Sequence, residues 1–279
     1  MRPDNELMDY NSLLKTFLIS VVSSLFAFLI VFFFSNYASL FFAYDFDIPA
    51  SFNLEGIIFS TNFENNIWSR DAMVTILLSK PISAVIGGII FLFILMLRTK
   101  KTVSIILLLF WLNVFAFNSA FGVFIDDAVA RSGTYEVAVA MHINNILLIA
   151  LAIILAFILI KIGMMNGRLM LLSFANQNLF SRIHRIIFFS VIFLVPWLLV
   201  VIFTCFMGCT ILSISGALKN LPVIFLLIPF LAASKPENLK FEYLSAKPFS
   251  KTDLILAFIF ILTSIILIFA IKNGILISG

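Results

Sequence analysis

The residues able to carry out acid–base chemistry in this sequence lie close together, between two long apolar stretches. His142 could act as a proton acceptor, and Asp126 and Asp127 are carboxylates that could act as its acid or base partners. Asn118, Gly122 and Asp126 are spaced four and four, so a regular helix would place them on one face. We therefore predict His142, Asp126 and Asp127 as candidate catalytic residues of a polar pocket open to the outer side of a membrane.

Other polar side chains fall at membrane depth and widen this candidate pocket. Ionisable groups inside a membrane are costly and are functional candidates by default. The alternative is that Asn and His side chains join helices through hydrogen bonds worth about 1 kcal/mol each, and that Lys80 reaches the headgroups by snorkelling. The candidate residues of the polar cavity are Lys80, Asn113, Asn118, His142, Asn144 and Asn145.

The sequence lacks the local signatures of common membrane enzymes. The two histidines, His142 and His184, do not form H-E-x-x-H, and neither G-x-S-x-G nor a P-loop occurs. We expect no cofactor, no metal and no nucleic-acid partner. The sequence therefore favours a non-enzymatic protein, although an enzyme stays open.

Composition assigns the whole chain to a membrane. Of the 279 residues, 62% are hydrophobic and 11% are charged, and the mean hydropathy is +1.16. An average soluble domain is about half apolar and about a quarter charged, so a water-soluble enzyme is excluded. The charges form short clusters between long uncharged runs, which is typical of a polytopic protein. We predict an all-α transmembrane helix bundle that forms a single integral membrane domain, residues 1–279.

The elements that must position the polar residues are the membrane spans, and the uncharged runs predict about seven. A helix needs roughly 20 residues to cross the hydrocarbon region. The run at 220–234 is the weakest, because it is short and contains Pro222 and Pro229, so it is either a short helix or a re-entrant segment. The predicted spans are about 16–36, 81–97, 102–125, 137–160, 186–210, 220–234 and 254–276.

Basic residues predict the orientation, because cytoplasmic flanks of membrane proteins collect Lys and Arg. With seven spans and a cytoplasmic N-terminus, thirteen of the 18 basic residues lie inside. If 220–234 did not cross, the division would be nine against nine, so seven spans in the plasma (inner) membrane are preferred. The five basic residues on the outer side are Arg70, Lys80, Arg131, Lys219 and Lys272.

Two connecting segments are long enough to have structure of their own. The outer loop 43–70 is rich in aromatic residues and is expected to lie against the outer leaflet and cap the helices. The inner segment 166–185 is amphipathic, and its basic residues Arg168, Arg182 and Arg185 are expected to bind anionic lipid or a cytoplasmic partner. Gly163, just before this segment, and Gly167, within it, fit G-x-x-x-G, which at this cytoplasmic end is expected to be a turn.

Three functions are consistent with these features. The first is a non-catalytic subunit or scaffold of a membrane complex, with the two long segments as partner surfaces. The second is a transporter or permease with an outer-leaflet polar cavity around Asn118 and His142. The third is an enzyme that acts on a lipid or membrane-bound substrate at the outer surface. The lipid bilayer is the expected partner in all three.

Overall fold

The structure is a computed structural model that describes residues 10–54, 56–61, 63, 67–97, 101–131, 133–174, 182–206, 219–232, 250–272 and 275–277. Parts of several predicted segments lie outside these residues, namely 55, 62 and 64–66 in the outer loop, 175–181, 207–210, 233–234 and 273–274.

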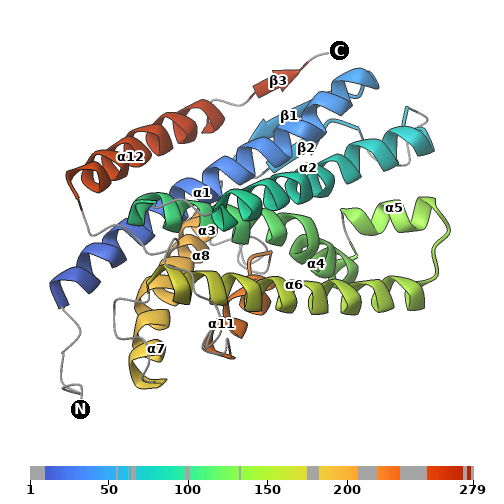
Figure 1. The fold of residues 1–279 in the computed structure, drawn as a ribbon. Helices are drawn as coiled ribbons and strands as arrows, with labels where there is room; N and C mark the ends of the chain where they lie inside the picture. Colours follow the sequence, from blue (N-terminus) through green and yellow to red (C-terminus); the bar gives the residue numbers. More distant parts are fainter. Residues whose placement is uncertain are drawn as a thin grey trace.

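Six helical stretches of the described chain are long and apolar enough to cross a membrane, which confirms a multi-pass, mainly α-helical protein (Figure 1). Two of these stretches contain a π-helical turn. The six are α1 (Tyr10–Asp45), α2 (Arg70–Met96), α3 (Val103–Phe117) continued by η1 (Asn118–Gly122) and α4 (Val123–Ala130), α6 (Asn145–Ser173), α7 (Arg182–Phe189) continued by η3 (Ser190–Leu194) and α8 (Val195–Phe206), and α12 (Lys251–Lys272).

Shorter elements connect or cover these helices. They are α5 (Thr134–Ala140), α10 (Val223–Leu227), α11 (Pro229–Ala232) and the strands β1 (Ala50–Asn53), β2 (Gly56–Phe59) and β3 (Ile275–Ile277). The predicted span at 220–234 is thus two short helices with a break at Ile228, where Pro229 begins the second. Proline lacks the backbone N–H that would continue the first helix.

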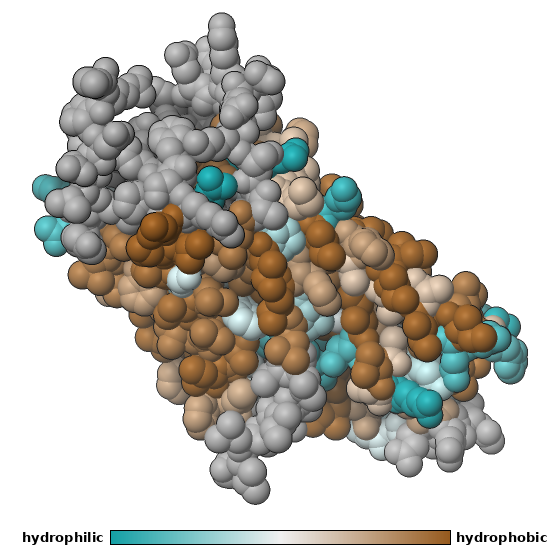
Figure 2. All heavy atoms as spheres, turned by 90° about the horizontal axis from the view of Figure 1, so that it is seen from below, coloured by the Kyte–Doolittle hydropathy of each residue, from teal (hydrophilic) through white to brown (hydrophobic). Residues whose placement is uncertain are grey.

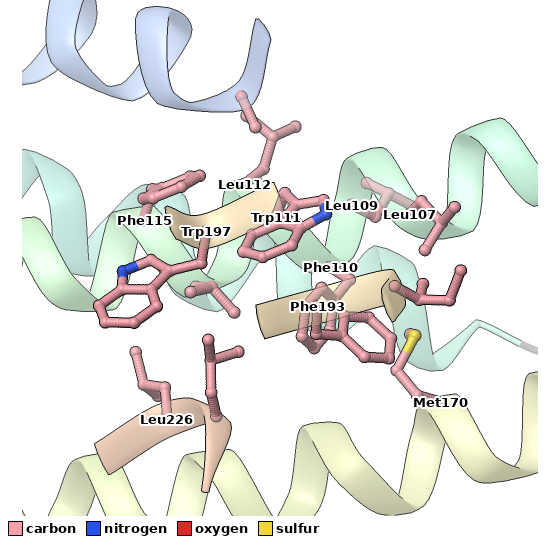
Figure 3. Close-up of a cluster of buried hydrophobic side chains, with 14 of the residues drawn as sticks. Leu107, Leu109, Phe110, Trp111, Leu112, Phe115, Met170, Phe193, Trp197 and Leu226 are labelled. Atoms are coloured by element: carbon pink, nitrogen blue, oxygen red, sulfur yellow. The ribbon is translucent and has the colours of Figure 1, made fainter. Parts of the chain in front are cut away.

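Helix α3 forms the centre of the bundle. It is apolar on all sides and buried from Val103 to Phe117 apart from Ile105 and Leu108, as expected for a helix with no polar face. Its aromatic residues pack against one another and against the α7–α8 stretch (Figure 3). The ring centroids of Phe110 and Phe193 are 4.6 Å apart, and those of Trp111 and Phe115 are 5.5 Å apart.

The π-helical turn η3 has an identifiable cause in Pro196. A proline at this position donates no hydrogen bond to the carbonyl four residues before it, which is Ile192 O. Ser20 of α1 supplies the missing donor through its hydroxyl group, and Ser20 Oγ in turn accepts a 3.0 Å hydrogen bond from Trp111 Nε1. The irregular turn therefore joins α1, α3 and the α7–α8 stretch.

A small antiparallel sheet covers one end of the bundle, with strand order β2–β1–β3. Strands β1 and β2 form a hairpin from the predicted outer loop, and β3 follows α12. Phe52 and Trp68 pack there with Leu40 of α1 and Ile76 of α2. We call this end the cap end, and the opposite end, where α3 and α12 begin, the clasp end.

Helix boundaries differ from the sequence prediction at several places, including both ends of α1, which is Tyr10–Asp45 and not about 16–36. Ser69 Oγ accepts a 3.1 Å hydrogen bond from Ala72 N and starts α2 at Arg70, eleven residues before the predicted span. The span predicted at 137–160 is interrupted, because α5 ends at Ala140 and α6 begins only at Asn145. Helix α6 then continues to Ser173, so the glycines at 163 and 167 are helical and the predicted turn is wrong.

Large apolar side chains are exposed along α2, α6 and α12, as expected for helices that face lipid. Figure 2 shows such a surface on one side of the molecule, where hydrophobic residues form most of the coloured area. These exposed faces support contact with a lipid bilayer.

Candidate functional site

Two amides tie the centre of the bundle together. Asn113 Nδ2 donates to Gly88 O of α2 at 2.9 Å, and Asn166 Nδ2 of α6 donates to Asn113 Oδ1 at 2.7 Å. Both Asn side chains are fully buried. Gly88 also leaves room for the ring of Phe117, which would lie 3.1 Å from an added Cβ. These two hydrogen bonds join α2, α3 and α6, and Asn166 Oδ1 is buried without a hydrogen-bond partner among the described residues.

A backbone contact lies close to these amides. Gly163 of α6 faces Leu226 of α10, and a Cβ at Gly163 would lie 2.5 Å from the Leu226 carbonyl oxygen. Only glycine allows the two backbones to approach this closely. Gly163 is therefore a helix-packing position for α10.

Lys80 lies inside α2, ten residues after its start, which is about 15 Å along the helix at 1.5 Å per residue. Its side chain is partly buried, and Nζ donates to Asn36 Oδ1 of α1 at 3.1 Å. Asn36 Nδ2 donates to Phe32 O at 2.7 Å, which fixes the orientation of the amide. The Lys80 side chain therefore bonds to α1 and does not snorkel toward the headgroups.

The surroundings of Lys80 are polar on the α1–α2 interface. Ser79 Oγ donates to Ser39 Oγ at 2.9 Å, next to the contact between Lys80 and Asn36. Gly56, at the start of β2, has a φ of 116° that suits glycine, and its Cβ position lies 3.9 Å from Asn36 Oδ1. The hairpin therefore covers this polar contact from the cap end.

Asp127 has a structural role that its backbone surroundings explain. Its Oδ2 accepts hydrogen bonds from Thr134 N at 2.8 Å and Thr134 Oγ1 at 3.0 Å, at the start of α5. Gly133 has a φ of 57°, and a Cβ there would lie 2.5 Å from the same carboxylate oxygen. Asp127 is buried and Asp126 is partly buried, and Lys219 is the basic group that acts electrostatically on Asp126.

Asn118 connects η1 with the segment that leads into α10. Its Nδ2 donates to Lys219 O at 3.1 Å. Its Oδ1 is buried without a hydrogen-bond partner among the described residues, and it fills the space that a Cβ of Gly122 would occupy. The π-helical turn changes the regular spacing, so the sequence argument from positions four apart does not apply as it stands.

The remaining candidates lie in the turn between α5 and α6, where all three are exposed. His142 has a φ of 56° in that turn, Asn144 Oδ1 accepts from Ile146 N at 3.0 Å as the N-cap of α6, and Asn145 begins the helix. The structure thus brings Lys80, Asp126, Asp127 and Asn118 to the region around Lys219 and gives His142 no described contact with them.

Sequence reasoning missed the most extensively bonded carboxylate, Asp253. One oxygen of this fully buried side chain accepts from Ser104 N at 3.0 Å and Ser104 Oγ at 2.7 Å, and the other accepts from Ser250 N at 3.0 Å and Ser250 Oγ at 3.1 Å. It therefore caps both α3 and α12. Ser250 and Asp253 fit the S-x-x-[DE] capping box before an apolar run, and that signal was available in the sequence.

Within the described ranges, no group of three or more His, Cys, Asp or Glu side chains could hold a metal ion. Arg168 is exposed on α6, and Arg185 is partly buried on α7, whereas the side chain of Arg182 lies outside what the structure describes. No protein-family model, no curated protein and no solved structure matches the chain.

Proposed function

We propose that the chain is a non-catalytic subunit or scaffold of a membrane complex, crossing the plasma (inner) membrane seven times with its N-terminus in the cytoplasm. The observation that carries the proposal is the packed centre of the bundle. Aromatic rings of α3 and the α7–α8 stretch fill it, and Asn113 links Gly88 of α2 to Asn166 of α6 there through two hydrogen bonds. Such a centre favours rigid positioning of helices over passage of a solute.

Chain direction supports the seventh crossing. The pairing of β3 with β1 brings the ends of α1 and α12 together at the cap end, and the bonds of Asp253 to Ser104 bring the starts of α3 and α12 together at the clasp end. The α7–α8 stretch runs parallel to α1, because Ser20 meets Ile192 while Phe28 meets Phe203 further along. The chain must therefore return to the clasp end before α12, and α10 and α11 lie along α6 on this return.

Charge supports a cytoplasmic clasp end. Among the described residues, basic side chains near the clasp end are accompanied by a single acidic one, Asp253, whereas acidic side chains gather near the cap end. Cytoplasmic flanks collect basic residues. The clasp-end basic residues are Lys15, Lys101, Arg168, Arg185 and Lys251, and the cap-end acidic residues are Asp45, Asp47, Asp71, Asp126, Asp127 and Glu136. Arg168, Arg182 and Arg185 would bind anionic lipid of the inner leaflet.

Single cysteines introduced into a cysteine-free variant test the topology. A membrane-impermeant maleimide should label Val129→Cys, an exposed position on α4, in intact cells, and should label Lys251→Cys only after permeabilisation. The reverse labelling would contradict the orientation, and equal labelling of both in intact cells would contradict the bundle's position across the membrane.

Partner surfaces test the scaffold role. Purification in a mild detergent should yield a complex with other polypeptides at fixed stoichiometry in native mass spectrometry. Ile58 on β2 is exposed at the cap end, so Ile58→Glu should remove a partner bound to the hairpin, whereas Val129→Glu is a matched exposed control. A stable species that contains only this chain would contradict the proposal.

A second candidate function is a transporter or permease, and Lys80 favours it, because an ionisable group inside a membrane is a functional candidate. Reconstituted vesicles would show flux of a polar solute that Lys80→Met abolishes. Absence of flux for anions, cations and neutral polar solutes would contradict the transporter function.

A further inference from the structure

We propose that Lys80 is the centre of an anion-binding site toward the cap end of the bundle, which takes a phosphate or carboxylate group. This goes beyond the scaffold function, which requires no ligand. The proposal rests on the hydrogen bonds, burial and charged neighbours of the Lys80 side chain.

The hydrogen-bonding capacity of Lys80 is largely unused. An ammonium group has three N–H donors. Among the described residues, Lys80 Nζ has one acceptor, the neutral amide oxygen Asn36 Oδ1, and no carboxylate lies within ion-pair distance. A partly buried ammonium with one neutral partner is expensive unless an acceptor completes its shell. An anionic ligand would provide both the acceptors and the opposite charge.

The charged groups near Lys80 are a second ammonium group, Lys219, and the carboxylates of Asp126 and Asp127. Lys219 and Asp127 are the two charged residues that act electrostatically on Lys80. Asp127 directs one oxygen to the backbone N–H and the hydroxyl group of Thr134, so part of its accepting capacity is already used. Asp126 acts on Lys219 from the same helix turn. Neither ammonium group forms an ion pair among the described residues, so each can donate charge-assisted hydrogen bonds to a phosphate or carboxylate.

The local structure holds Lys80 ready for such a ligand. Asn36 cannot turn its amide away without losing its bond to Phe32 O, and Ser79 and Ser39 add hydroxyl groups beside it. Gly56 of the hairpin lies next to Asn36, so the hairpin covers the site from the cap end. The anion could belong to a lipid headgroup or to a small free molecule, since the same phosphate chemistry is present in both.

The test measures anion-dependent thermal stability in nanodiscs. Full-length protein in phosphatidylcholine is titrated with inorganic phosphate, and a second series replaces part of the phosphatidylcholine with phosphatidylglycerol. We expect the unfolding temperature to rise with one of the two anions. Lys80→Met should weaken the apparent affinity about tenfold or more, as expected for loss of a charge-assisted contact, and Lys80→Arg should retain binding. A response to phosphate in neutral lipid identifies a free anion, and a response only to phosphatidylglycerol identifies a headgroup.

Lys101→Met is the matched control, because Lys101 is also a partly buried lysine with one carbonyl acceptor, Leu97 O, but lies at the clasp end. It should respond to the anion as the wild type does. If Lys80→Met does not fold, Lys219→Met, at an exposed side chain, should weaken the response several-fold. The proposal is overturned if the wild type responds to neither anion, or if the folded Lys80→Met and Lys219→Met variants respond like the wild type.

Discussion

Two charged side chains in the interior, one near each end of the bundle, have opposite surroundings. At the clasp end, the Asp253 carboxylate is fully buried and accepts four hydrogen bonds from Ser104 and Ser250. Toward the cap end, the Lys80 ammonium donates to one neutral amide, Asn36, among the described residues. A buried charge whose hydrogen bonds are satisfied within the protein stabilises the fold. A charge with unused hydrogen-bonding capacity is available to bind a ligand.

Sequence context accounts for part of this difference. Asp253 follows a capping serine at the start of a helix, where free backbone N–H groups are available to a carboxylate. Lys80 lies in the middle of α2, where the backbone carbonyls are used within the helix and only neighbouring helices can offer acceptors. The position along the helix therefore decides whether the backbone can neutralise a buried charge.

The largest effect should come from removal of the Asp253 carboxylate. Asp253→Ala leaves Ser104 N–H buried without an acceptor and leaves the Ser104 hydroxyl group only its 3.4 Å bond to the backbone carbonyl of residue 253, and we expect a loss of about 3 kcal/mol in the free energy of unfolding. Asp253→Asn should lose less, because one amide oxygen can still accept from Ser104. Chemical denaturation in detergent measures both values.

Thr263→Val is the control for this substitution, since Thr263 bonds only to carbonyls of its own helix and valine keeps its shape. It should change the free energy of unfolding by less than about 0.5 kcal/mol. An Asp253→Ala variant as stable as this control would show that the four hydrogen bonds do not hold α3 and α12 together.

A smaller loss is expected at the backbone contact between α6 and α10. Gly163→Ala introduces a Cβ that would meet the Leu226 backbone, so the helices must separate, at a cost of about 2 kcal/mol. Gly87→Ala is the matched control, because its Cβ would contact only the Phe91 ring at 3.5 Å, and it should stabilise α2 by about 0.5 kcal/mol. Equal effects of the two substitutions on thermal unfolding would argue against close packing at Gly163.

Gly163 also illustrates what the sequence could and could not predict. Apolar runs predicted the multi-pass helical architecture, because the length of an uncharged segment follows directly from the thickness of the bilayer. The same runs led to the wrong prediction of a turn at Gly163, because a G-x-x-x-G sequence indicates helix packing only where a partner helix lies against it. Helix starts were misplaced for a similar reason, since Ser69 and Asn144 act as caps through side-chain bonds that hydropathy does not report.

The candidate site shows the same limit. Lys80, Asn113 and Asn118 were found because polar residues at membrane depth are rare. Their partners Asn36 and Asn166 were missed, because each lies on a helix distant in sequence and the pairing depends on packing. The grouping of His142 with Asn118 assumed unbroken helices, whereas η1 and the turn before α6 change both positions.

A modest effect is expected for the paired amides at the centre of the bundle. In a double-mutant cycle with Asn113→Leu and Asn166→Leu, we expect a coupling of about 0.5 to 1 kcal/mol, in the range of interhelical hydrogen bonds in membranes. Asn113→Leu also breaks the bond to Gly88, so its single effect should exceed that of Asn166→Leu. If the two amides did not interact, the effects of the two substitutions on the free energy of unfolding would be additive. Asn113→Leu combined with Ser264→Ala on α12 is the control pair, for which we expect additivity.

The smallest effect, and the only one with the opposite sign, is expected at Lys80 itself. In a zwitterionic detergent without phosphate or anionic lipid, Lys80→Met should leave the free energy of unfolding unchanged or raise it by up to about 1 kcal/mol, because methionine has similar length and loses no hydration on burial. Asp127 would not be left unbonded, since Thr134 still donates to it twice.

The control variant Lys101→Met should instead lower the free energy of unfolding by a few tenths of a kcal/mol, because it removes a cation near the end of α2. If Lys80→Met were destabilised by about 2 kcal/mol or more, Lys80 would be a structural tie like Asp253. The contrast between the two ends would then no longer distinguish a binding group from a structural one.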